Sequence, residues 1–182
     1  MNIPDSTRLS YQFMTRNDAE LFFELDQDSE VMRYINGGKI TSMEDIIAVF
    51  IPRLERYADQ NKGWGMWRVS LATHQQSDLF LGWILVRPMD FFTDMPQWDN
   101  LEIGWRFKQI AWGKGYATEA AQAVMAVVTQ DSKLNSISAI ALEDNLESIN
   151  IMKKLGMKFL KKKYVGDSLV KAEVVYYQKS LR

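Results

Sequence analysis

Two glycines placed two residues apart give this sequence its clearest chemical signal. They lie in the stretch 112–116, WGKGY. Glycine has no Cβ, so the chain can turn sharply there and a ligand can approach the backbone closely. Apolar residues recur at helical spacing from Ala117 onward, which places the glycines at a helix N-terminus. Free N–H groups at the start of a helix bind anions, and phosphate suits them best.

Other reactive residue types are scarce in the 182 residues. There is no cysteine, which excludes disulfides, thiolate nucleophiles and zinc–thiolate sites. His74 is the only histidine and lies in a polar turn, so we expect no metal site. The net charge of −1 argues against a nucleic-acid partner. No apolar run approaches the ~20 residues that span a membrane, and the first residues do not read as a signal peptide, so we expect a cytoplasmic protein without a membrane partner.

The glycine loop needs a strand before it and a helix after it. Residues 101–108 alternate between apolar and polar side chains, which is the period of a strand. Gly104 interrupts this strand, and a bulge or a close backbone approach is expected there. Apolar residues at 117, 120, 121, 124, 125 and 128 then share one face of a helix.

The rest of the chain supplies further strands and helices in mixed order. Strands are expected at 8–14, 65–72, 79–87, 136–142, 158–164 and 170–179, and helices at 21–25, 30–35, 43–54 and 146–155. Thr41 and Glu44 form an expected capping box, and Pro52 should kink the helix that follows. Phe91, Phe92 and Trp98 lie in an expected loop, where they could wall a pocket, meet a second copy or form a small core. The pattern predicts a single domain, residues 1–182, of the mixed α/β (α+β) class.

Two motifs together resemble those of a known family. The glycine stretch continues as residues 112–120, WGKGYATEA, and a second motif runs from Asn145-x-x-Ser148 to residues 154–157, KLGM. They are similar to the motifs of GNAT-superfamily N-acetyltransferases, in the branch that contains the RimJ/RimL-type ribosomal-protein N-terminal acetyltransferases. The resemblance covers nearly the whole chain. It implies a mostly antiparallel sheet, flanked by helices and split into a V between the strands that contain Leu101 and Ser136.

The resemblance also implies that acetyl-CoA is the cosubstrate and lies in this V. Its pyrophosphate would bind the glycine loop, and its pantetheine arm would follow the strand before the loop. The residues expected at the cofactor are Ile103, Gly104, Trp105, Gln109, Ile110, Trp112, Gly113, Lys114, Gly115, Tyr116, Ala117, Thr118, Asn145 and Met152. Two of these depart from the family pattern. Ile110 stands where Gln or Arg is frequent, and Met152 stands where many members carry a tyrosine general acid.

The reaction implied is attack of a neutral amine on the acetyl-CoA thioester. Glu102 is the expected general base, acting directly or through water, with a solvent-facing strand residue as the alternative. Ser148 is the nearest candidate to protonate the leaving thiolate, with helix capping as its alternative role. An α-amine has a pKa of ~7.7–8.0 and a lysine amine one of ~10.4, so a protein N-terminus is the easier acceptor at neutral pH.

Other functions remain open from the sequence. The acceptor could be a small-molecule amine such as an aminoglycoside or polyamine, and Met152 leaves room for a non-catalytic acyl-CoA-binding module. A dinucleotide-binding oxidoreductase fits less well, because Thr118 replaces the third glycine of G-x-G-x-x-G and βαβ repetition is absent. Members of this branch often dimerise, so the resemblance admits a homodimer.

Overall fold

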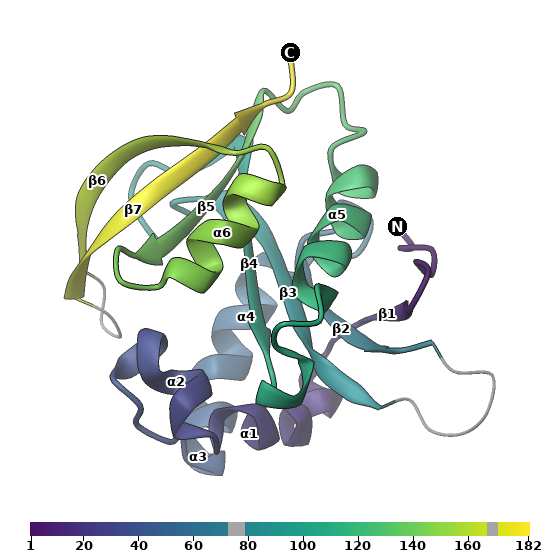
Figure 1. Ribbon diagram of the computed structural model, residues 1–182, viewed down its shortest axis with the longest axis vertical. Helices are drawn as coiled ribbons and strands as arrows, with labels where there is room; N and C mark the ends of the chain where they lie inside the picture. Colours follow the sequence, from purple (N-terminus) through teal and green to yellow (C-terminus); the bar gives the residue numbers. More distant parts are fainter. Residues whose placement is uncertain (73–78, 167–170) are drawn as a thin grey trace.

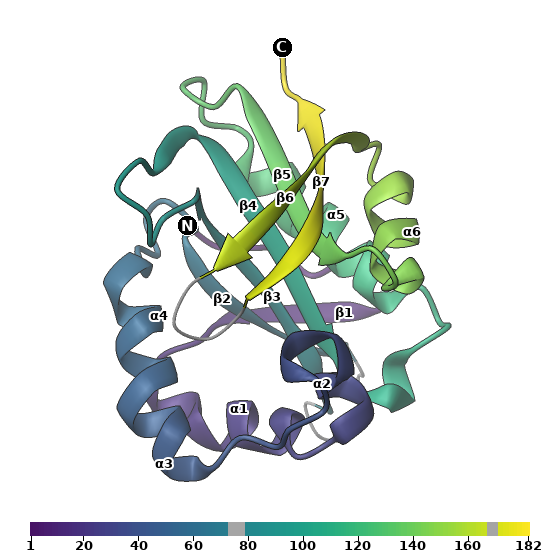
Figure 2. The same cartoon turned by 90° about the vertical axis from the view of Figure 1, so that its left-hand side faces the viewer.

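One sheet organises the molecule (Figures 1 and 2). The computed structural model describes residues 1–72, 79–166 and 171–182, so the turn with His74 lies outside the described residues. Within them, seven strands pair in the order β1-β2-β3-β4-β5-β7-β6. The strands are β1 (Leu9–Phe13), β2 (Gly65–Leu71), β3 (Phe80–Met89), β4 (Gln97–Phe107), β5 (Ser136–Leu142), β6 (Lys158–Gly166) and β7 (Lys171–Ser180). Every neighbouring pair is antiparallel except β4 and β5.

Helices cover both faces of this sheet, and each face has its own core. One face packs α1 (Ala19–Asp26), α2 (Ser29–Asn36), α3 (Met43–Asp45) and α4 (Ile51–Tyr57). The other face packs α5 (Tyr116–Val128) and α6 (Leu146–Lys154). Three short helical segments complete the described fold: η1 (Arg16–Asp18), η2 (Ile46–Phe50) and η3 (Gln109–Ala111). The predicted mixed fold with flanking helices is confirmed.

The sheet splits between β4 and β5, as the resemblance implied. The two strands pair over three positions, Asn100 with Ser136, Leu101 with Ile137 and Glu102 with Ser138. Beyond these pairs β4 continues to Phe107 and β5 to Leu142, and Figure 1 shows the two strands diverging. The result is a V whose vertex lies at Glu102 and Ser138.

A buried chain of polar side chains joins the two strands at the vertex. The Ser138 hydroxyl donates to Asn100 Oδ1 at 2.9 Å, and Asn100 Nδ2 donates to Gln97 Oε1 at 3.0 Å. From β7, Gln178 Nε2 donates to Ser138 Oγ at 3.2 Å. Ser138 and Asn100 are both buried, so these bonds satisfy groups that water does not reach. They hold together strands that share only a short ladder.

The helix expected at 43–54 differs from its prediction at its N-cap, and a π-helical segment precedes Pro52. Ser42, rather than Thr41, caps it, because the Ser42 hydroxyl accepts the N–H of Asp45 at 3.0 Å, while Thr41 donates to Asp26. The run then widens into the π-helical segment η2 just before Pro52, which lies in the first turn of α4. Proline has no N–H and its ring clashes with the carbonyl four residues earlier, and a π turn relieves both problems.

The aromatic loop before β4 is shorter than predicted and is packed against the fold. β4 begins at Gln97, so Trp98 belongs to the strand, and its ring stacks on Trp64 with centroids 6.0 Å apart. Phe91 and Phe92 meet the ring of Tyr57 edge-on at 5.7 and 6.1 Å. These phenylalanines therefore extend the core under α4.

The outermost strand at one edge of the sheet is β6, which pairs with β7. Its side chains from residue 158 to 164 are exposed and include four lysines, at positions 158, 161, 162 and 163. Lys162 forms an ion pair with Glu143 at 2.6 Å, between groups that are both open to solvent.

Candidate active site

A cleft of about 410 Å³ opens beside the V. Its walls come from the end of β4, the glycine loop, the start of α5, the outer face of α6 and, from the other half of the molecule, α2. The expected site residues that line it are Trp105, Trp112, Gly113, Gly115, Tyr116, Ala117, Thr118, Asn145 and Ser148. The two sequence motifs, which are about thirty residues apart, therefore face one another across one cavity.

The glycine loop presents a row of N–H donors to this cleft. Gly113 and Gly115 have φ angles of +70° and +79°, a backbone region that glycine enters readily, and Gly115 caps α5 without any side-chain bond. The first N–H of this helix that donates to a backbone carbonyl belongs to Glu119, whose acceptor is the Gly115 oxygen at 3.0 Å. The N–H groups of residues 113–118 donate to no backbone acceptor among the described residues. Unpaired donors at the positive end of a helix dipole suit a phosphate group.

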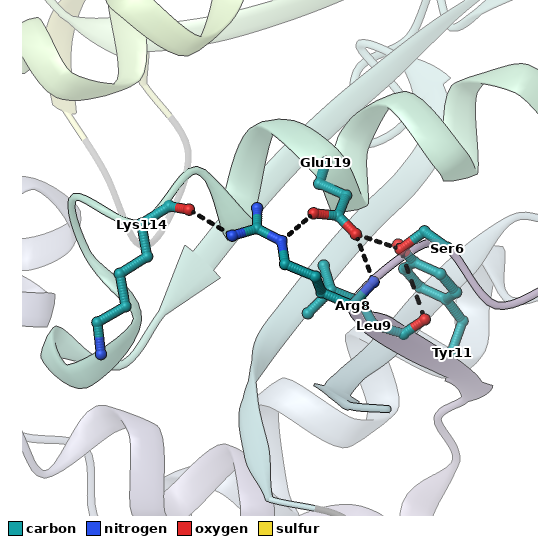
Figure 3. Close-up of polar contacts among 6 residues, drawn as sticks. All are labelled: Ser6, Arg8, Leu9, Tyr11, Lys114 and Glu119. Carbon is teal, nitrogen blue, oxygen red and sulfur yellow. Dashed lines mark hydrogen bonds and ion pairs between the residues drawn. The ribbon is translucent and has the colours of Figure 1, made fainter. Parts of the chain in front are cut away.

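A group of side chains behind the loop ties it to the first strand (Figure 3). Arg8 Nε donates to Glu119 Oε2 at 2.7 Å, and Arg8 Nη1 donates to the carbonyl oxygen of Lys114 at 3.0 Å. Glu119 Oε1 accepts the Arg8 backbone N–H at 2.9 Å and the Ser6 hydroxyl at 2.8 Å. We call this group the Arg8 anchor.

The pKa of Glu119 depends on its burial and on the hydrogen bonds that it accepts within the Arg8 anchor. Partial burial raises the pKa of the carboxyl group, but the hydrogen bonds from Ser6 and Arg8 together outweigh it and hold the pKa below its ordinary value. Glu119 is therefore a charged acceptor at neutral pH, fixed on the first turn of α5. Arg8 also lies over the ring of Tyr116, with Cζ 4.5 Å from the centroid.

On the opposite wall, α6 and β4 fix the hydroxyl of Ser148. Asn145 caps α6 as predicted, because its Oδ1 accepts the N–H of Ser148 at 3.1 Å. Trp105 Nε1 donates to Ser148 Oγ at 3.2 Å. Ser148 is thus not the capping side chain, and because Oγ already accepts from Trp105, its own proton can be directed elsewhere.

Glu102 lies at the vertex of the V, and the alternative of a solvent-facing residue is wrong. Glu102 is only 6% exposed. Arg87 of β3 donates to both of its carboxylate oxygens, from Nε at 2.8 Å and from Nη2 at 3.1 Å. The Arg87 guanidinium lies 5.7 Å from the ring centroid of Tyr57. Burial raises the pKa of Tyr57 well above its ordinary value, with the charge of Arg87 opposing and that of Glu102 adding to the shift. Glu102 does not line the cleft.

The other expected cofactor residues also lie outside the cleft lining. Ile103 and Met152 are each 1% exposed and belong to the core under α5 and α6. Ile110 is 55% exposed, and Gln109 donates to both oxygens of Asp28. The Lys114 side chain extends away from Arg8 in Figure 3.

Gly104 does not form the bulge that the sequence suggested. It pairs in register with Leu85, and the register shift between β3 and β4 lies at Pro88 and Met89. Gly104 instead follows the last β4–β5 pair, where the strand edge toward β5 has opened. A close backbone approach is available on that side.

Helix α2 is the wall that sequence reasoning missed. Its residues Glu30, Arg33 and Tyr34 line the cleft, as does Lys154 of α6. Asp28 caps α2 and accepts the side chain of Gln109, so the segment after β4 holds this helix in place. No motif marks α2, since its contribution depends on contacts with residues about eighty positions away.

Within the described residues, no three His, Asp or Glu side chains are grouped as a metal site would require. No helix in residues 1–72, 79–166 and 171–182 has the length and apolar character to cross a membrane.

Comparison with known proteins identifies the family. The model of the acetyltransferase (GNAT) domain matches residues 8–158. The chain belongs to the GNAT acetyltransferase family. An N-acetyltransferase of Bacillus subtilis, YnaD, whose function is uncharacterised, is 32% identical over 78% of this chain and 74% of its own.

Solved structures share the whole fold. A GNAT-family acetyltransferase from Bacillus anthracis is 27% identical, with a TM-score of 0.74, over 99% of this chain and 98% of its own. RimL, a ribosomal L7/L12 α-N-protein acetyltransferase solved with coenzyme A, has a TM-score of 0.73 at 13% identity, over 99% and 98%. The aminoglycoside acetyltransferase AAC(6')-Ib, solved with coenzyme A, has a TM-score of 0.74 at 14% identity, over 95% of both chains. The protein is thus an acetyl-CoA-dependent acyltransferase of the GNAT type.

Proposed function

We propose that this acetyltransferase transfers the acetyl group of acetyl-CoA to a primary amine by direct attack, and that the amine is the α-amine of a protein N-terminus. The observation that carries this proposal is the V with the glycine loop at its open end. It combines an opened strand edge with a row of N–H groups at a helix N-terminus that have no backbone acceptor among the described residues. Such a cleft suits a long cosubstrate with an anionic middle and a neutral reactive end.

In this proposal the pyrophosphate binds the N–H groups of residues 113–118. The pantetheine arm runs along the open edge of β4 past Gly104, where no side chain blocks the backbone. The amide nitrogen of Asn145 makes no hydrogen bond with any described residue and is free to donate to that arm. Trp105 and Tyr116 supply apolar surface to the cleft walls.

The incoming ammonium must lose a proton before its nitrogen can attack the thioester carbon. Glu102 is the proposed base, and because it lies buried at the vertex it acts through a water molecule. Each of its oxygens accepts one bond from Arg87, and a carboxylate oxygen can accept a further one. Arg87 then serves as a positioning residue that fixes the direction of the remaining lone pairs.

Attack forms the C–N bond and moves negative charge onto the thioester oxygen. A backbone N–H of β4 near Gly104 or Trp105 can donate to that oxygen. The C–S bond then breaks, and the thiolate, with a pKa of ~8.5, takes a proton. Ser148 is the proposed donor, since Trp105 occupies its acceptor side and leaves its proton for the sulfur. The attached nitrogen loses its remaining extra proton as the amide forms, and in this proposal that proton returns through water to Ser148 and restores its hydroxyl. Met152 is buried and takes no part.

The choice of acceptor rests on chemistry and on a shared fold. A protein α-amine, with a pKa of ~7.7–8.0, is partly neutral near pH 7.5, whereas a lysine amine is almost wholly charged. RimL, which acts on a protein α-amine, has the same fold. AAC(6')-Ib also has this fold and supports a small-molecule amine as the second candidate.

An acceptor screen tests the proposal. Acetyl-CoA turnover would be measured with peptides of varied N-terminal residue, with the same peptides blocked at the N-terminus, and with aminoglycosides and polyamines. We expect turnover with free N-termini and none with the blocked peptides. Turnover confined to small amines would reject the protein acceptor but keep the enzyme class. Absence of turnover with every amine, despite tight acetyl-CoA binding, would favour a non-catalytic acyl-CoA-binding module.

A further inference from the structure

We propose that Arg8 is a positioning residue for the cosubstrate: it fixes the orientation of the Lys114–Gly115 peptide so that the Gly115 N–H points at the pyrophosphate. This inference rests on the proposed acetyl-CoA site. Arg8 lies immediately before β1, more than one hundred positions before the loop, and belongs to neither sequence motif. Figure 3 shows its guanidinium between the Lys114 carbonyl and Glu119.

The geometry of a peptide unit carries the first step. In a trans peptide the C=O and the following N–H point in opposite directions. The Lys114 carbonyl points at Arg8 Nη1, 3.0 Å away, on the side of β1. The N–H of Gly115 must therefore point away from Arg8. Because Gly115 lines the cleft, that is the direction in which a bound phosphate is expected.

A glycine loop needs such a restraint. Rotating the Lys114–Gly115 peptide by half a turn changes ψ of Lys114 and φ of Gly115, and glycine tolerates φ of either sign. The flipped peptide would present a carbonyl oxygen, instead of an N–H, to an anion. No side chain in the described part of the chain caps α5 to prevent this. Among the described residues, the side-chain hydrogen bond to this peptide comes from Arg8.

The anchor itself is held from several directions. Glu119 fixes Arg8 through Nε and through its backbone N–H, and Ser6 donates to the same carboxylate. Glu119 belongs to α5, so the guanidinium is attached to the helix whose N-terminus it orients. Arg8 can therefore bind the helix and the loop at once, which requires the planar fork of a guanidinium. A lysine ammonium would not span both acceptors in this geometry.

The experiment compares the wild type with Arg8→Ala and Arg8→Lys. Dissociation constants would be measured by calorimetry for coenzyme A and 3′-dephospho-coenzyme A, which both contain the pyrophosphate. Turnover would be measured with acetyl-CoA and with S-acetylpantetheine, which contains no phosphate. Arg16→Ala is the matched control, because Arg16 forms a similar pair with Glu55, at 2.7 and 2.9 Å, on another part of the surface.

We expect both Arg8 variants to bind the two pyrophosphate ligands roughly tenfold more weakly, because neither holds the Lys114–Gly115 peptide in place and one N–H bond to the phosphate is then lost. KM for acetyl-CoA should rise with kcat nearly unchanged, kcat/KM for S-acetylpantetheine should stay at the wild-type value, and Arg16→Ala should change nothing.

Unchanged affinity in folded Arg8→Ala would overturn the inference. An equal loss with S-acetylpantetheine would also overturn it, since a merely structural role affects every substrate. If Arg8→Ala fails to fold, Arg8→Lys retains the charge and answers the same question. Weak coenzyme A binding by the wild type would instead reject the proposed cofactor site.

Discussion

The buried carboxylate of Glu102 shows how a residue's chemistry depends on its neighbours. The sequence predicted that Glu102 lies on the strand before the glycine loop, and that strand assignment is correct. Its partner Arg87 lies on β3, fifteen positions earlier, and no local pattern pairs the two. The bond to Arg87 and the burial under α4 follow from strand register, which one sequence does not determine.

Replacing Glu102 with Gln tests the proposed base. The amide keeps the size of the side chain but cannot take a proton. We expect turnover near neutral pH to fall by ~10²–10⁴-fold, with the affinity for acetyl-CoA little changed. The deficit should shrink as pH approaches the pKa of the amine, because free amine then forms without help. Steady-state kinetics between pH 6.5 and 9, with far-UV circular dichroism as the folding control, measure this. A variant as fast as wild type at every pH would contradict the assignment.

Gly115→Ala should weaken coenzyme A binding through backbone strain. A Cβ at Gly115 would meet Arg8 at an ordinary contact distance of 3.5 Å, so crowding is not the reason. The φ of +79° is the cause, since other L-residues lose roughly 1–2 kcal/mol there. The same strain applies at Gly37, which has the same φ and an open surrounding. Both variants should lose similar unfolding free energy, and only Gly115→Ala should raise the dissociation constant. Equal affinities in calorimetry would refute this.

At the scale of elements, periodicity predicted the strands and helices that carry a single strong pattern. β4, α5 and α6 lie where alternation and the Asn145 cap place them. The run from α3 to α4 was harder, since Thr41 and Ser42 are both good caps and tertiary contacts chose between them. Thr41 binds Asp26 of α1 instead. The vertex network was also beyond prediction, because Asn100 and Ser138 resemble solvent-facing strand residues until their burial is known.

Ser138→Ala should loosen the vertex of the V. The change removes the hydroxyl that donates to Asn100 and accepts from Gln178, which leaves buried polar groups unpaired. We expect a loss of about 1–3 kcal/mol in the free energy of unfolding, measured in urea. Ser136→Ala is the control, since Ser136 is less buried and has one such contact, from Gln178. A loss at position 138 no greater than at 136 would show that the network does not stabilise the junction.

At the scale of the whole molecule, the two motifs predicted the general fold. They did not predict how the segment before β1 contacts α5. The Arg8 anchor joins residues 111 positions apart. Arg8 and Ser6 stand in an ordinary polar stretch before a strand, and their hydrogen-bonding groups have many candidate partners. Glu119 is the partner of Arg8 and Ser6 because β1 lies beside α5 in the folded protein. Contacts of this kind depend on topology, and periodic patterns do not report topology.

Glu119 makes the stability of the molecule depend on acidity. Its folded-state pKa is lowered, so its contribution is present above the ordinary value of 4.5 and is lost as pH falls through the folded-state pKa. Between pH 5 and pH 3 the wild type should therefore lose more unfolding free energy than Glu119→Gln, which has no group to titrate there. Urea unfolding at a series of pH values measures both slopes. Identical slopes would mean that the Arg8 anchor does not stabilise the charged carboxylate in solution.

The exposed lysines of β6 have a consequence for solubility. A free strand edge can recruit a strand from a neighbouring molecule, which is a common route to aggregation. Two β6 edges brought together would place positive side chains against one another, and like charges on facing strands repel. Polyanions neutralise that repulsion, so we expect them to promote precipitation of the protein. If two copies of this chain do associate specifically, the contact is expected on a face of the molecule other than this edge.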